Sequence, residues 1–80
     1  MAIGLINIEK TLQEKNIVTY KYYTIDSGVG FVTIDRGTGD FNIIQIAEGD
    51  FDYSLSKRVY WALIRHFEEG DLPEKTCWAS

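Results

Sequence analysis

Two glycine-containing turns between runs of β-branched and aromatic residues constrain the fold of this chain most strongly. Residues 17–26 and 31–35 are mostly valine, isoleucine, threonine, tyrosine and phenylalanine, which pack well on a pleated sheet. The segments 27–30 and 36–39 follow these runs, and each contains two glycines. Because glycine adopts the backbone angles that turns require, the pattern predicts an antiparallel meander of three strands.

The turn at 36–39 sets which residues of the second and third strands share a face. It places Ile34 opposite Phe41 and Val32 opposite Ile43. A loop of three residues at 27–29, or one that differs from it by two residues, adds alternate residues of the first strand to that face. A two-residue loop would instead exchange the two faces of that strand. The predicted core face carries Val18, Tyr20, Tyr22, Val32, Ile34, Phe41 and Ile43.

The segment before the first strand has helical periodicity. Leu5, Ile8 and Leu12 follow the i, i+3, i+7 spacing of one helical face, and charged and polar residues fill most of the rest. This spacing predicts a helix near residues 4–15, which Asn16 ends.

A second helix is predicted after the third strand. Asp52 or Ser54 can accept backbone N–H groups as its N-cap, and the helix runs to Gly70. The predicted fold is therefore α+β in the order α-β-β-β-α, a three-stranded antiparallel meander with two helices packed on one face. Residues 1–70 form a single domain. Residues 71–80 have no periodicity and form a C-terminal tail that either packs back or frays.

The charge balance argues against nucleic acid as a partner. Twelve acidic and eight basic residues give a net charge of −4, whereas proteins that bind the phosphate backbone rely on Lys and Arg. The predicted element order resembles that of double-stranded RNA-binding domains, and Ser56-Lys57-Arg58 resembles their phosphate-contacting motif. This resemblance implies an RNA-binding module. The pI near 4.7 weighs against that function, so we assign no family.

Trp61 is the most informative residue of the second helix, because it lies outside the helix's apolar arc. That arc consists of Leu55, Val59, Tyr60, Ala62, Leu63, Ile64 and Phe67. Lys57 and Arg65 are its neighbours at four residues, and Arg58 is close. Trp and Arg are enriched among residues that contribute most to interface energy, so these four residues form a first candidate binding patch. The alternative is that the tail, with Leu72, Pro73 and Trp78, folds over Trp61.

The outward face of the meander is more apolar than a solvated face requires. Tyr23, Phe31 and Ile44 lie on it in the register above and form a second candidate patch. A homodimer or another protein partner would bury this patch. The alternative is a mixed surface with scattered apolar residues, which is common in soluble proteins.

Catalytic and metal-binding groups are sparse. His66 and Cys77 are the only histidine and cysteine, and no motif supplies a third group for a nucleophile. The loop carboxylates do not have the spacing of a calcium loop. We therefore predict no catalytic residue, no metal and no cofactor. A single cysteine and the absence of a basic N-terminal leader favour the cytoplasm.

Three functional hypotheses remain open. The first is a non-enzymatic protein-interaction or regulatory module, either a homodimer or an acidic inhibitor-type partner of a basic protein. The second is a small-molecule-binding domain whose pocket lies between sheet and helices, lined by tyrosines and His66. The third is a double-stranded RNA-binding-like module. No apolar stretch has the length of a membrane-spanning helix, so we expect a protein partner or self-association, no nucleic acid and no membrane.

Overall fold

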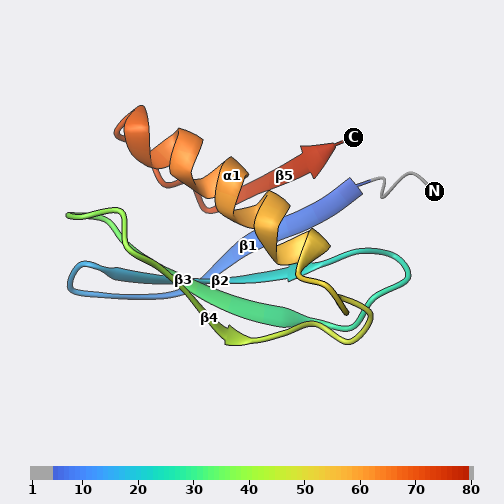
Figure 1. Cartoon of the computed structure of the whole chain (residues 1–80). Coiled ribbons are helices and arrows are strands. Elements are labelled where there is room, and N and C mark those ends of the chain that lie inside the picture. Colours follow the sequence, from blue (N-terminus) through green and yellow to red (C-terminus); the bar gives the residue numbers. More distant parts are fainter. Residues whose placement is uncertain (1–4, 80) are drawn as a thin grey trace.

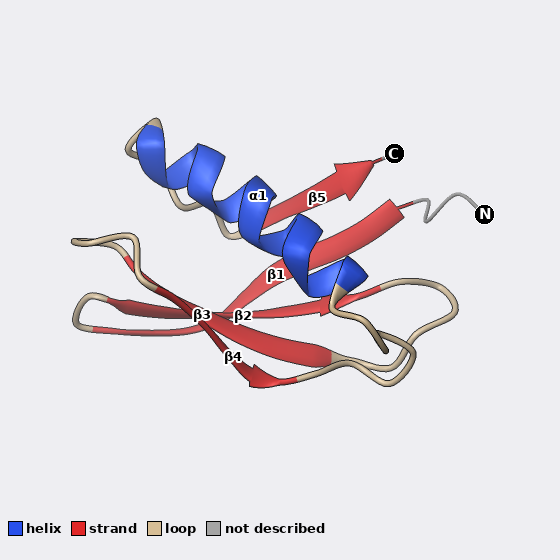
Figure 2. Ribbon diagram, viewed as in Figure 1, coloured by secondary structure: helices blue, strands red, loops and turns tan. Residues whose placement is uncertain are grey.

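The computed structural model describes residues 5–79, which form five antiparallel strands and one helix (Figures 1 and 2). The elements are β1 (Leu5–Glu14), β2 (Ile17–Tyr23), β3 (Gly30–Asp35), β4 (Phe41–Gln45), α1 (Ser54–Glu68) and β5 (Lys75–Ala79). The strand order in the sheet is β4-β3-β2-β1-β5, so the last strand lies beside the first. Within residues 5–79, α1 covers one face of this sheet, and no helix covers the other.

The α+β class is confirmed, but the predicted α-β-β-β-α arrangement with a three-stranded meander and two helices is wrong. Most of the predicted first helix, residues 4–15, is the strand β1. The predicted tail, residues 71–80, contributes β5, which pairs with β1 from Leu5↔Ala79 to Glu9↔Lys75. The resemblance to RNA-binding domains rested on the element order and is lost with it. Predictions for residues 1–4 and Ser80 lie outside the described residues.

A β-bulge explains the misleading periodicity of β1. Ile6 and Ile8 alternate into the core and are fully buried. The register of β1 against β2 then shifts between Lys10 and Leu12, so that Leu12 lies on the outer face, as Leu5 does. The three apolar residues that imitate a helical face are thus distributed over both faces of a strand.

The core lies between the sheet and α1. The predicted pairs Val32↔Ile43 and Ile34↔Phe41 are confirmed, and the loop from β2 to β3 is longer than predicted because β2 ends at Tyr23. Ile43 shares a face with the core residues but remains partly exposed, since it lies on the edge strand. The buried core consists of Ile6, Ile8, Val18, Tyr20, Tyr22, Val32, Ile34, Ala47, Leu55, Val59, Ala62 and Leu63.

A buried carboxylate holds the start of α1. Asp50 is only 2% exposed, and its Oδ1 accepts the backbone N–H of Leu55 at 2.9 Å. Its Oδ2 accepts the Ser56 N–H at 3.1 Å and the Tyr22 hydroxyl at 2.9 Å. These two N–H groups belong to the first turn and have no partner within the helix. The acceptor is therefore Asp50, which precedes both N-cap residues predicted from the sequence.

Among the described residues, α1 is the single helix, and it is neither long nor apolar enough to cross a membrane.

Candidate interaction surfaces

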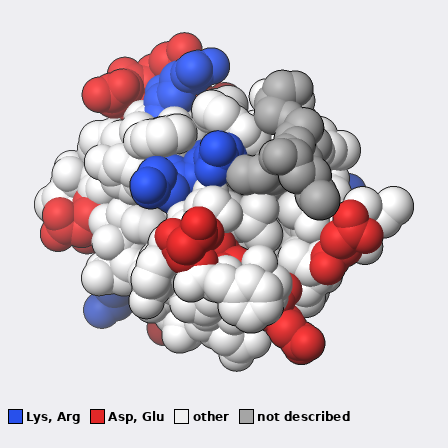
Figure 3. Space-filling model, turned by 45° about the vertical axis from the view of Figure 1, so that its right-hand side comes forward, with Lys and Arg blue, Asp and Glu red and all other residues white. Residues whose placement is uncertain are grey.

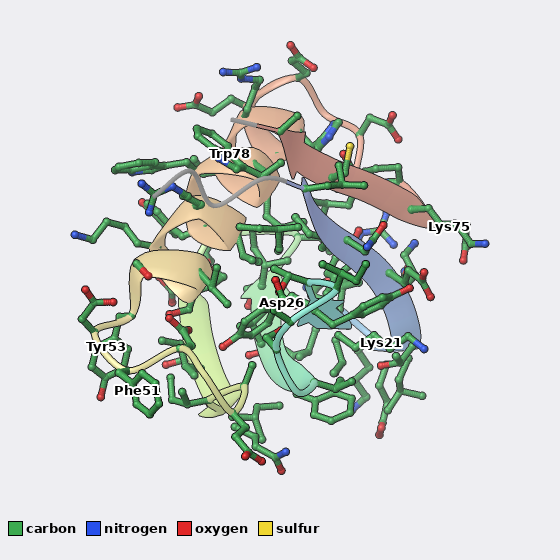
Figure 4. The ribbon with its side chains drawn as sticks, turned by 90° about the vertical axis from the view of Figure 1, so that its right-hand side faces the viewer. Lys21, Asp26, Phe51, Tyr53, Lys75 and Trp78 are labelled. Atoms are coloured by element: carbon green, nitrogen blue, oxygen red, sulfur yellow. The ribbon has the colours of Figure 1, made fainter. Side chains whose placement is uncertain are left out.

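Trp61 lies on the solvent side of α1, and Trp78 of β5 packs beside it. The ring centroids are 6.0 Å apart and the ring planes are inclined by 48°. Figure 4 shows Trp78 on the side of the sheet that α1 covers. The C-terminal segment therefore reaches Trp61, as the alternative interpretation predicted, but it leaves this residue 46% exposed.

The basic residues predicted beside Trp61 differ in exposure. Lys57 and Arg65 are exposed, and Arg58 is half-buried, with its Nη1 donating to the Ser54 carbonyl oxygen at 2.8 Å. None of the three forms an ion pair with a residue between 5 and 79. On the face drawn in Figure 3, Lys and Arg side chains gather at neighbouring points near the middle, and acidic side chains are scattered around them.

A groove of about 360 Å³ runs along α1 and the edge strand β5. Its lining residues are Ala62, Arg65, His66, Thr76, Cys77, Trp78 and Ala79. His66 Nε2 lies 2.9 Å from Thr76 Oγ1. Because strand side chains alternate, Cys77 points to the opposite face of the sheet and does not approach His66. Sequence reasoning missed this groove, since it requires β5.

The second candidate patch lies on the outer face, but the structure divides it. Tyr23 belongs to a polar cluster in which its hydroxyl donates to Glu9 Oε2 at 2.8 Å, and Lys21 Nζ lies 3.5 Å from Glu9 Oε1. The Tyr23 hydrogen bond lowers the pKa of Glu9, and the same bond raises the pKa of Tyr23. Both effects favour a carboxylate paired with a phenol. In Figure 4, Lys21 and Lys75 lie on this side, away from α1.

Phe31 and Ile44 instead belong to an uncharged region at the other edge of the sheet. Phe31 pairs with Gln45, whose Nε2 donates to the Val29 carbonyl oxygen at 3.4 Å. A register shift leaves Ile44 unpaired and 62% exposed. We call this region the β4 surface. It consists of Val29, Phe31, Thr33, Asn42, Ile44 and Gln45, together with Ile43 of the same edge strand, which points to the face that α1 covers.

Two loops at one end of the sheet hold the most exposed apolar side chains. Ile25 is 96% exposed and Phe51 is 92% exposed. A backbone hydrogen bond of 2.8 Å from Gly28 N–H to the Glu48 oxygen ties the two loops together. Figure 4 shows Phe51 and Tyr53 at the periphery of the molecule. Sequence analysis gave these residues no role, because exposure of a loop residue depends on where the loop packs.

The remaining chemistry is limited. In the described part of the chain, no three His, Cys, Asp or Glu side chains are grouped to hold a metal ion. Tyr20 and Tyr22 fill the space between sheet and helix instead of lining a pocket there. A second hollow, of about 300 Å³, lies near Phe67 and Gly70. Comparisons with protein-family profiles, with curated proteins and with solved structures found no match.

Proposed function

We propose that this protein is a non-enzymatic protein-interaction module, and that the β4 surface joins two copies of it into a homodimer. One observation carries the proposal: the seven residues of the β4 surface carry no charge, although 25% of the chain is charged and Lys21, which pairs with Phe31, lies at the border of the surface. Two copies with a net charge of −4 repel each other. They approach with least repulsion, and bury most apolar area, where the surface is neutral and carries exposed isoleucines.

The backbone of β4 supports the same surface. Asp35 N–H donates to the Asp40 oxygen at 2.8 Å, so by alternation the N–H and C=O groups of Phe41 and Ile43 point away from β3. Natural edge strands are often protected from pairing by lysine or proline, and Phe41–Gln45 contains neither. Antiparallel pairing of two β4 strands about a two-fold axis would extend the sheet across the dimer and cover Ile43.

The one pair of residues considered as a nucleophile and base, His66 and Cys77, is not brought together. His66 contacts Thr76, and Cys77 lies on the other face of the sheet. The alternative within the same class is an acidic inhibitor-type partner of a basic protein, for which the net charge is suited. We place the protein in the cytoplasm, because a lone cysteine suits a reducing compartment.

Light scattering across a concentration series tests the homodimer. We expect about twice the 9.2 kDa mass of one chain, decreasing on dilution. Ile44→Asp introduces a carboxylate that meets no positive charge within the β4 surface. Because burial of an unpaired charge is costly, this variant should be monomeric.

Leu12→Asp is the matched control. Leu12 is 55% exposed on the outer face, like Ile44, but it lies on β1, three strands away from β4. This variant should remain dimeric. A wild-type protein that is monomeric at every concentration refutes the homodimer and leaves the inhibitor-type alternative. If both variants are monomeric, the interface is not confined to the β4 surface but includes the outer face of the sheet at β1, and the assignment to the β4 surface is wrong.

A further inference from the structure

We propose that the groove between α1 and β5 binds an extended acidic peptide segment, which adds to the sheet as a further strand beside β5. The groove lies at the edge of the sheet opposite β4. This inference therefore does not rest on the proposed homodimer, and either can fail without the other.

The backbone of β5 has free hydrogen-bonding groups on the side of the groove. Lys10 N–H donates to the Glu74 oxygen at 2.8 Å, and this bond fixes the phase of the β1–β5 ladder. By alternation, the N–H and C=O groups of Cys77 and Ala79 point away from β1. Both residues line the groove. A peptide in extended conformation would pair with these groups, as in strand addition to an open sheet edge.

The dimensions of the groove suit alternate side chains of such a strand. Its volume of about 360 Å³ lies at the lower end of the range of ligand sites. Ala62 contributes only a methyl group to the wall on the α1 side, and the Trp78 ring contributes an apolar surface. One apolar side chain of the peptide would lie in the groove against Ala62 and Trp78, and its neighbours along the peptide would point out of the groove.

The charge of the groove selects an acidic ligand. Arg65 lines the groove, is exposed, and has no ion-pair partner among residues 5–79. Arg58 lies two helical turns earlier on the same side of α1, and Lys57 precedes it. A guanidinium group binds carboxylates through two parallel hydrogen bonds. This basic region in a chain of net charge −4 favours a ligand with carboxylates.

Trp78 supplies an independent observation. Its indole Nε1 is buried and has no acceptor in the described structure, where every other buried side-chain polar atom has a partner. Since buried N–H groups are almost always hydrogen-bonded, a donor without a partner in a residue that lines the groove would gain one if the Trp78 ring turned toward a bound ligand. A peptide carbonyl or a carboxylate would provide it.

The probe is a short capped peptide of alternating Glu and Val, titrated into the whole chain and followed by tryptophan fluorescence and by amide NMR shifts. We expect saturable binding, with shifts at the amides of Cys77 and Ala79. The same peptide N-methylated at alternate amides should not bind, because it cannot pair with β5. A Lys-Val peptide of equal length should bind at least about tenfold more weakly.

Arg65→Glu should weaken binding of the Glu-Val peptide by about tenfold, whereas Arg36→Glu should change it less than about threefold. Arg36 is the matched control, because it is exposed and lies in the turn between β3 and β4. Circular dichroism checks that both variants fold. Absence of binding at about 1 mM peptide overturns the proposal. Equal binding of the N-methylated peptide, or an equal effect of both substitutions, also overturns it.

Discussion

Replacement of Asp50 by alanine should destabilise the protein strongly, because one buried carboxylate satisfies three donors. The change removes the acceptor for the N–H groups of Leu55 and Ser56 and for the Tyr22 hydroxyl. Asp50 is 2% exposed, so water does not readily replace it. The substitution therefore affects the start of α1 and the centre of the core at the same time.

The expected loss can be worked out from these contacts. Removal of a helix cap costs about 1 kcal/mol. A buried hydroxyl left without its acceptor costs about 1–3 kcal/mol, so the loss for Asp50→Ala totals about 3 kcal/mol. A chain of this size is stable by roughly 4–12 kcal/mol. Asp50→Asn retains one side-chain oxygen and should lose about half as much.

Urea unfolding, followed by circular dichroism, measures this loss as a shift of the midpoint at constant slope. Tyr22→Phe in the Asp50→Ala background should cost less than in the wild type, because the hydroxyl has already lost this acceptor. If Asp50→Ala unfolds within about 0.5 kcal/mol of the wild type, the carboxylate does not hold α1 and our reasoning is wrong.

Two further predictions concern the tyrosines of the core. Burial raises the pKa of Tyr20 and of Tyr22 from 10.0 to about 12, so the folded state keeps protons that the unfolded chain loses. Stability should be complete below pH 10 and should fall towards pH 12 by up to about 1.4 kcal/mol per pH unit for each tyrosine. Urea midpoints at increasing pH measure this fall; Tyr22→Phe should reduce it, and a flat profile would contradict it. Gly30→Ala should cost about 3 kcal/mol, because its Cβ would overlap the buried Tyr22 ring. Thermal unfolding measures this loss, and Gly70→Ala is the control. A Cβ at Gly70 meets no atom within 4 Å, so that substitution should cost only about 1 kcal/mol for its φ of +80°. Equal losses of stability in the two variants would show that the Tyr22 ring moves aside without cost.

The central hairpins could be predicted from the sequence because their information is local. The turn at 36–39 fixes the pairing of Ile34 with Phe41, and the alternation of Val18, Tyr20 and Tyr22 matches a half-buried strand. The apolar arc of α1 could be predicted for the same reason, since the helical periodicity lies within one continuous segment. These elements are specified by neighbours in sequence.

The errors arose where structure depends on distant residues. The bulge between Lys10 and Leu12 breaks the two-residue alternation of β1 and leaves a spacing that imitates a helix. β5 has only five residues, and it is a strand because β1 supplies its hydrogen bonds. For the same reason, the contact of Trp61 with Trp78 was foreseen only as an alternative, and the groove was not foreseen. The strand order decides which surfaces remain exposed to solvent, and no local sequence pattern encodes that order.

The pairing of β5 with β1 also determines the order in which the strands of this protein assemble during folding. Residues that face each other across this ladder are separated by 66 to 74 positions along the chain, whereas β1 to β4 are joined by short connections. Loop-closure entropy therefore favours assembly of the four-stranded meander before β5 docks. β5 pairs with β1 alone and has the longest separation in sequence from its partner, so its docking is also the first contact expected to open. The groove exists only while β5 is paired with β1. A ligand bound there would therefore stabilise this pairing, and its apparent affinity would fall as the fraction of molecules with β5 undocked rises.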